Sequence, residues 1–438
     1  MEWSSIGRSV VLPCGVRLKN RLCKAATSEH LGEPRQNDVT PELVRLYERW
    51  GDGGAGLIIT GNVIVSRGAL EAPRNVVLDE RTEMDGVRAW ARACRRGGAV
   101  AIVQLSHAGR QSPVAASWAR PVAPSAVALR LPGVGLPLHR APREMRIEDV
   151  RRVVRSFALA ARLAVEAGFD GVQIHAAHGY LLSQFLSPRG NTRTDAYGGD
   201  DAKRLAALLE VVAAVRAAVG DRRVVGLKLN ASDFEDGGFD EHGCAKALAA
   251  LDATRCLDLV ELSAGTYAGG VACMGDPADF GLRRSFLDLA TDLRDRSCPT
   301  LRLVVTGGLS TRESAARAAD RDFLVGIARP MCLDPNLPLR WLRHEEEDEA
   351  RIAENLPKIP RIWRRLFVPG LRFGWSLRQL GRLARDLPPA PLWHAPYLLF
   401  VLPRHLLFEP ARLSVRNAAI IFFGVVTAPT VVLLLKSN

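Results

Sequence analysis

The chain has 438 residues, of which 47% are hydrophobic and 24% are charged. This is enough for one large α/β domain of roughly 250 residues or more and a further segment. The net charge is +12, but residues 361–438 contribute +9 of it, so the rest of the chain is close to neutral. This uneven distribution argues against nucleic-acid binding and predicts that a basic tail lies at a membrane surface.

The eight cysteines form no Cys-x-x-Cys pair. Their spacing excludes a recognisable iron–sulfur cluster or zinc ribbon, and we expect no metal site. Scattered cysteines of this kind are typical of a reduced, intracellular setting. The first residues also lack the basic and then apolar stretches of a signal peptide, which favours the same location.

Eight short apolar runs alternate with segments of helical periodicity. The predicted strands are 21–27, 55–60, 100–106, 171–177, 224–230, 259–264, 301–307 and 322–328. Strand and helix repeated eight times, with nearly continuous apolar strands, predict an α/β fold of the (β/α)8 TIM-barrel type. A doubly wound sheet is the alternative, but no Gly-x-Gly-x-x-Gly turn follows an early strand.

The end of the fourth predicted strand carries His175, His178 and Tyr180 in the spacing His-x-x-His-x-Tyr. Parallel barrels place their chemistry at the carboxyl ends of their strands. Two imidazoles beside a phenol can hold a substrate oxygen while a proton is delivered nearby. A zinc site is the rival interpretation, but no Glu or Cys accompanies the histidines at a familiar spacing.

Other strand ends carry polar residues as well. Gln104 lies near the end of the third strand, and Lys228 lies within the fifth, where a lone cation needs an anionic partner. Glycines follow the seventh and eighth strands, where backbone N–H groups can approach a phosphate that an arginine clamps. Each feature also has a structural reading, as a buried amide, an internal ion pair or ordinary turns.

Together these features resemble the old yellow enzyme family of FMN-dependent NAD(P)H oxidoreductases. The resemblance covers roughly residues 6 to 350 and includes, besides the strand-four motif, residues 18–21, 185–188 and 193–199. It implies that FMN is the cofactor, with NADH or NADPH as hydride donor. The cofactor-binding positions that it implies are Ala25, Ala26, Thr27, Ser28, Asn62, Gln104, Lys228, Gly307, Gly308, Gly326, Ala328 and Arg329.

The resemblance also implies a role for each part of the site. His175 and His178 match the pair that binds the substrate oxygen, and Tyr180 matches the proton donor. The implied reaction is ping-pong reduction of activated alkenes, which are α,β-unsaturated carbonyl or nitro compounds. Lys228 replaces the usual arginine near flavin N1 and O2, and it supplies charge without the bidentate fork.

Three further positions depart from the family pattern. Ala26 stands where many members have proline, and Ala328 stands where they usually have glycine. His30 occupies a position where one branch has a tyrosine that covers the substrate, so we include His30 among the substrate-binding candidates. Two alternatives stay open, namely dehydrogenation or demethylation with the same flavin, and a catalytically silent scaffold on the same barrel.

The C-terminal run 418–435 contains eighteen residues without a charge. As a helix it spans roughly 27 Å, close to the ~30 Å hydrocarbon core, so we expect a transmembrane helix; a buried helix or a segment lying on the membrane is the alternative. The predicted domains are a barrel at 1–360, a basic aromatic membrane-proximal segment at 361–417, and the span. Positive charge before the span predicts a C-terminally anchored protein on an intracellular membrane, with the barrel in the cytosol.

Overall fold

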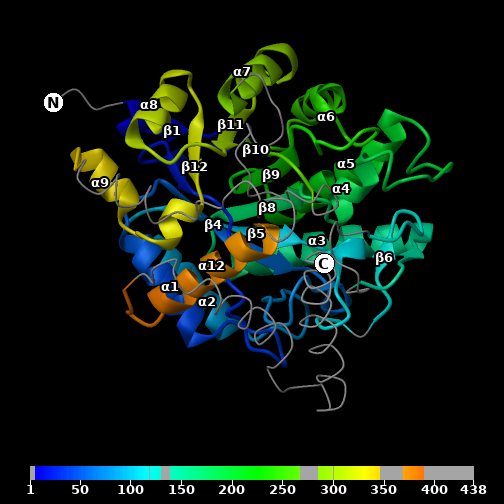
Figure 1. The fold of residues 1–438 in the computed structure, drawn as a ribbon, viewed down its shortest axis with the longest axis horizontal. Helices are drawn as coiled ribbons and strands as arrows, with labels where there is room; N and C mark the ends of the chain where they lie inside the picture. The colour runs from blue at the N-terminus through cyan, green and yellow to red at the C-terminus, as the bar shows by residue number, and fades with distance from the viewer. Residues whose placement is uncertain are drawn as a thin grey trace, which may run out of the picture.

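The structure is a computed structural model that describes residues 5–117, 119–129, 139–266, 285–298, 300–345 and 368–388. Within them, eight parallel strands close into a barrel with helices around its outside (Figure 1). In order around the barrel, the strands are β3 (Leu22–Lys24), β4 (Leu57–Ile64), β5 (Val100–Ser106), β8 (Gly171–Ala176), β9 (Val224–Asn230), β10 (Leu259–Ser263), β11 (Arg302–Thr306) and β12 (Leu324–Ile327). The predicted barrel is therefore confirmed, with each of the eight strands close to its expected place.

The remaining described elements surround this barrel. The helices are η1 (Ser5–Gly7), α1 (Pro41–Asp52), η2 (Arg67–Ala69), α2 (Met84–Arg95), η3 (Gly109–Gln111), α3 (Ile147–Glu166), α4 (Leu181–Leu186), α5 (Asp201–Val219), α6 (Glu241–Thr254), α7 (Phe286–Ser297), α8 (Arg312–Asp320), η5 (Arg329–Cys332), α9 (Leu337–Arg343) and α12 (Val368–Leu383). Two small sheets pair β1 (Val10–Val11) with β2 (Arg17–Leu18), and β6 (Val122–Ala123) with β7 (Arg143–Glu144).

Helix α1 shows how the sequence determines the start and the buried face of an outer helix. Thr40 caps its N-terminus by accepting a hydrogen bond from the backbone N–H of Leu43, and Pro41 fits the first turn, which needs no donor there. Its buried side chains recur at helical spacing and face the barrel. They are Leu43, Leu46, Tyr47 and Trp50. This stripe of large apolar groups holds α1 against the strands.

The barrel interior changes from apolar to polar along its axis. Side chains that alternate along each strand point inward, so successive inward positions form layers. The lower layers hold buried apolar residues of five strands, among them Leu57, Ile102, Val224, Leu259 and Val304. Two residues further along, β5 and β10 carry Gln104 and Glu261 inward. The polar positions thus gather at the carboxyl end of the barrel.

Helix α12, orange in Figure 1, lies beside α1. Arg45 donates from Nε to the carbonyl of Ala384 at 3.3 Å, and Arg385 pairs with Glu42 at 2.8 Å. Trp375 joins the main hydrophobic core. This part of the predicted membrane-proximal segment therefore packs against the barrel.

The membrane-spanning part of the fold prediction is wrong. Among the described residues, no helix is both long enough and apolar enough to cross a bilayer. The run 418–435 on which the prediction depended, like the boundary placed at residue 360, lies outside those residues. The prediction depended on an uncharged run and on the basic residues before it, and neither establishes a membrane span. The C-terminal anchor, the membrane location and the lipid contacts inferred from it are therefore not supported.

Candidate functional site

A series of buried polar side chains crosses the barrel near the carboxyl ends of its strands. Gln104 donates from Nε2 to Oε1 of Gln173 at 2.7 Å, and Gln173 donates from Nε2 to Oε2 of Glu261 at 2.9 Å. Lys228 Nζ lies 2.8 Å from Glu261 Oε1. The register of the strands sets this pairing, because Lys228 in β9 stands directly beside Glu261 in β10. Glu261 thus supplies an anionic partner for the buried cation.

His175, His178 and Tyr180 meet where β8 passes into α4. The His175 ring lies 5.2 Å from that of His178 and 4.8 Å from that of Tyr180, centroid to centroid, with edge-on contacts. His178 adopts a left-handed backbone with φ of 60°. Its N–H donates to Oδ1 of Asn230 at 3.2 Å, and its Nε2 lies 2.7 Å from Oγ of Ser263. Neighbouring strands therefore hold the turn in place.

Both histidines are neutral hydrogen-bonding groups. Burial lowers the pKa of His175 well below its usual value, and the positive charge of Lys228 lowers it further. The pKa of His178 falls for the same two reasons, in the same order. The backbone N–H of Ala177 donates to Nδ1 of His175 at 3.2 Å, so the proton of this imidazole is on Nε2. The pair can donate hydrogen bonds without carrying charge.

Tyr180 is tied to the loop that follows β4. Its hydroxyl donates to Oε1 of Glu71 at 2.7 Å. Asn62 donates from Nδ2 to the other oxygen of the same carboxylate, and Ser28 Oγ lies 3.4 Å from that oxygen. Ser28 also donates to Oδ1 of Asn62 at 2.9 Å. The structure thus joins three predicted site residues through Glu71.

Sequence reasoning missed Glu71, Glu261 and Gln173. Glu261 carried a readable signal, because it is an acid inside an apolar strand and Lys228 needed a partner. Gln173 lies on an inward position of β8, two residues before His175. Glu71 carried no such signal, because a glutamate in a loop is ordinary.

The ends of β11 and β12 form a glycine-rich turn. Gly307 and Gly308 have φ of 142° and 69°, a backbone region that favours glycine. A Cβ at Gly326 would lie 1.8 Å from Oγ1 of Thr306, so only glycine allows the two strands to approach here. Among the described residues, this Oγ1 is buried without a hydrogen-bond partner. Arg329 opens η5 immediately after Ala328.

This turn fits a phosphate group. The two glycines leave their backbone N–H groups accessible at a strand end, where phosphates bind in such barrels. The buried Thr306 hydroxyl has no hydrogen-bond partner among the described residues, and a phosphate oxygen can accept a hydrogen bond from it. Arg329, three residues after Gly326, brings a cation to the same end.

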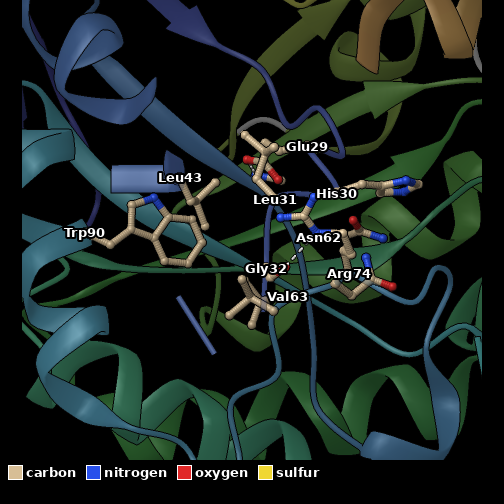
Figure 2. Close-up of a pocket in the computed structure, with 12 residues that line it drawn as sticks. Glu29, His30, Leu31, Gly32, Leu43, Asn62, Val63, Arg74 and Trp90 are labelled. Atoms are coloured by element: carbon tan, nitrogen blue, oxygen red, sulfur yellow. Dashed lines mark hydrogen bonds between the residues drawn. The ribbon is translucent and has the colours of Figure 1, made fainter. Parts of the chain in front are cut away.

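The remaining predicted residues lie where β3 ends. Ala25 continues β3 and donates from its N–H to the carbonyl of Ile327 at 2.9 Å, while Ala26 and Thr27 lead to Ser28. His30 has a left-handed backbone with φ of 52°. It lines a small cavity beside Asn62, in which Arg74 donates from Nε to the carbonyl of Gly32 at 2.9 Å (Figure 2). His30 and Asn62 are the predicted residues that line this cavity; His175, His178 and Tyr180 do not.

The fold and the site fit a barrel enzyme with a phosphorylated cofactor beside neutral hydrogen-bond donors. Among the described residues, no group of three or more His, Cys, Asp or Glu could hold a metal ion. The chain belongs to the NADH:flavin oxidoreductase / NADH oxidase family, whose sequence model matches residues 14–348.

Curated relatives and solved structures agree with this assignment. The chain is 38% identical over 402 residues to "NADH-dependent flavin oxidoreductase iliE" of Neonectria sp. (strain DH2), a match that covers 86% of this chain and 51% of the relative. It is 35% identical over 381 residues to the protein of the same name from Hypocrea jecorina (strain QM6a), covering 81% of this chain and 93% of that one. The chain therefore spans about half the length of the first relative and nearly all of the second.

Among solved structures, the old yellow enzyme homologue from Zymomonas mobilis matches with a TM-score of 0.67 and 26% identity, over 77% of this chain and 92% of that one. Morphinone reductase matches with a TM-score of 0.64 and 27% identity, over 79% and 91% of the two chains. The protein is an FMN-dependent NAD(P)H oxidoreductase of the old yellow enzyme type. The recognition of the family from its motifs is confirmed.

Proposed function

We propose that the protein reduces activated alkenes, in which a C=C bond is conjugated to a carbonyl or nitro group. The observation that carries this proposal is the cluster of His175, His178 and Tyr180, two neutral imidazoles and a phenol in edge-on contact. Such a cluster suits a reaction in which an oxygen gains negative charge while a carbon nearby gains a proton.

FMN would be held by three groups of residues around the carboxyl end of the barrel. Gln104 and Lys228 would face its pyrimidine edge, and residues 25–28 with Asn62 would line its ring. Gly307, Gly308, Gly326 and Arg329, with Ala328 beside them, would surround the phosphate. When bound, FMN would supply the hydride chemistry that connects NAD(P)H to the β-carbon of the alkene.

His175 and His178 would hydrogen-bond the carbonyl or nitro oxygen. Because burial and Lys228 lower the pKa of both, they stay neutral and do not compete as charged acids. A neutral donor stabilises the oxygen as charge develops on it, and in a buried site this contribution is larger than in water.

Tyr180 would protonate the α-carbon. Its side chain is 3% exposed and packs edge-on against His175, so it faces the same space as the oxygen-binding pair. His30 would lie at the rim, where it could cover the substrate. We infer a ping-pong order, because the described residues form one barrel with its attached elements and both substrates would use the same cavity.

Anaerobic rapid-mixing experiments test this function. NADH or NADPH should bleach the yellow enzyme without an alkene present, and 2-cyclohexen-1-one added afterwards should restore the colour. Reduction that requires the alkene would contradict the ping-pong order. Reoxidation by oxygen alone, with no response to unsaturated ketones or nitroalkenes, would contradict the substrate class. Dehydrogenation or demethylation would then be the reactions to examine.

A further inference from the structure

The Tyr180 hydroxyl makes a hydrogen bond to a carboxylate. It donates to Oε1 of Glu71 at 2.7 Å. Glu71 is held in turn by three polar groups: Asn62 donates to its other oxygen, Ser28 lies 3.4 Å from that oxygen, and the backbone N–H of Glu71 donates to Oδ1 of Asn75 at 2.9 Å. The carboxylate is therefore fixed in place beside the phenol.

This arrangement presents a difficulty for a proton donor. A phenol has one hydrogen, and in this structure that hydrogen points to Glu71. It cannot at the same time point to a substrate carbon. If Glu71 carries a proton, the hydrogen bond reverses: the carboxyl group donates to the phenol oxygen, and the phenolic hydrogen can turn to the substrate.

Tyr180 and Glu71 differ in their exposure to solvent. Tyr180 is 3% exposed, whereas Glu71 is partly exposed and lies in the loop between η2 and α2. A phenolate left inside the site would have poor access to solvent protons. Glu71 is the more exposed of the two residues and lies within hydrogen-bond distance of the phenol.

We propose that Glu71 is a positioning residue that acts through Tyr180. It gives Tyr180 a proton to replace the one that Tyr180 has transferred to the substrate. This inference rests on the proposed alkene reduction. The β-carbon accepts a hydride and the α-carbon accepts the phenolic proton. The phenol oxygen takes the carboxyl proton of Glu71, and the carboxylate takes one proton from water. Each turnover therefore consumes one hydride and one solvent proton.

The other ionisable groups around this pair do not take over its role. His175 and His178 lie on the same turn as Tyr180, and burial and Lys228 on β9 lower the pKa of both, so they do not supply protons near neutral pH. The small cavity that Asn62 lines is also lined by Glu29, His30 and Arg74. Glu29 accepts hydrogen bonds from Tyr47 and from the backbone N–H of Gly61. Glu71, by contrast, accepts a hydrogen bond from the Tyr180 hydroxyl.

The test compares Glu71→Gln with Glu71→Ala in the FMN-loaded enzyme. Glutamine can still accept a hydrogen bond from Tyr180 but cannot carry a proton, whereas alanine can do neither. We expect both variants to be reduced by NADH at the wild-type rate. Both should be reoxidised by 2-cyclohexen-1-one roughly 10²-fold more slowly, at the low end of the range for a positioned acid.

The pH profile separates a proton role from a structural one. The wild-type rate of reoxidation by the alkene should change with pH, because the proposed relay draws its proton from solvent. In Glu71→Gln the rate should not change with pH over the same range. Glu210→Gln is a matched control, because Glu210 also accepts a hydrogen bond from a tyrosine hydroxyl, that of Tyr197, at 3.1 Å. It should behave as the wild type.

Three results would overturn the proposal. The first is a normal rate and pH profile in Glu71→Gln with slowing only in Glu71→Ala, which would leave Glu71 as a mere hydrogen-bond acceptor. The second is a normal rate in both variants. The third applies even if Glu71→Gln fails to fold: a wild-type rate of reoxidation by the alkene that does not change with pH would mean that no relayed solvent proton limits the reaction. If alkenes do not reoxidise the reduced wild-type enzyme, that result would instead contradict the proposed function itself.

Discussion

Lys228 and Glu261 form an ion pair inside the barrel, with 2.8 Å between Nζ and Oε1 and side chains that are 5% and 0% exposed. A buried pair contributes little net stability, because desolvation offsets most of the attraction. Removing one partner is a different matter, since it leaves an uncompensated charge in the interior. The pair also links two strands to the polar layer through Gln173.

The first prediction concerns this pair. Glu261→Gln keeps the size of the side chain but leaves the buried Lys228 charge without an anionic partner. It should therefore lower the free energy of unfolding by about 3–5 kcal/mol. Adding Lys228→Met should recover part of this loss. Urea unfolding of the FMN-free proteins at pH 7 measures both effects. A double variant no more stable than Glu261→Gln would show that the buried charge is not the cause.

The second prediction concerns stability in acid. Burial lowers the pKa of His107 to about 4, whereas an unfolded histidine has a reference value of ~6.5. Between these values the unfolded chain binds more protons, so stability is complete above pH 6.5 and falls as the pH drops toward 4. From pH 7 to pH 5 this group should account for a loss of about 2 kcal/mol.

His107→Asn should remove that part of the loss, because asparagine can accept the backbone hydrogen bond that Gly109 donates to His107 Nδ1 at 3.1 Å. The control is His242→Asn, on the exposed side of α6. Urea midpoints at pH 7 and pH 5 give the comparison. The prediction fails if His107→Asn loses as much stability as the control.

The barrel could be predicted from the sequence because its strands are buried on both faces. Such strands read as nearly unbroken apolar runs, and β5 and β9 were located with their observed bounds. The end of β4 was placed too early. Its register shifts between Ile59 and Asn62, and the strand then continues to Ile64. A local irregularity of this kind leaves no clear mark in the hydropathy pattern.

The contacts within the site could not be predicted in the same way. Glu261 meets Lys228 only through the register of β9 and β10, which are adjacent in the barrel although the two residues are 33 positions apart in the chain. Glu71 reaches Tyr180 from a loop 109 residues earlier in the chain. The membrane anchor was predicted from the charge and hydropathy of the tail, without any tertiary contact to test it, and that prediction was wrong.

The third prediction concerns the phosphate. Thr306→Val removes a buried hydroxyl that makes no hydrogen bond to the described residues, so it should not destabilise the barrel. If this hydroxyl binds the FMN phosphate, affinity should fall by about 1.5–3 kcal/mol, or roughly 10- to 100-fold. Arg329→Ala should weaken FMN binding as well, whereas Arg317→Ala, on the exposed side of α8, should not. Quenching of FMN fluorescence measures affinity, and unchanged binding by Thr306→Val would place the phosphate elsewhere.

The fourth prediction concerns the oxygen-binding pair. A phenolate mimics the charged oxygen of the intermediate, so 4-nitrophenol should bind the oxidised enzyme beside His175 and His178. His175→Ala should weaken this binding roughly 10- to 100-fold, because one hydrogen bond to a charged oxygen is lost. The exposed His242→Ala serves as the control. Absorbance titration of the ligand gives the affinity, and equal affinities in the two variants would remove His175 from the assigned role.

The last prediction separates the two halves of the reaction. Tyr180→Phe removes only the hydroxyl, so the edge-on contact with His175 and the packing of the turn should persist. Reduction of FMN by NADH needs no proton from Tyr180 and should keep its wild-type rate. Reoxidation by 2-cyclohexen-1-one needs that proton and should slow by roughly 10²–10⁴-fold, the range for a positioned acid. Rapid-mixing absorbance records each half-reaction in turn. If the substitution slowed both equally, Tyr180 would be shaping the cavity or the flavin rather than donating a proton.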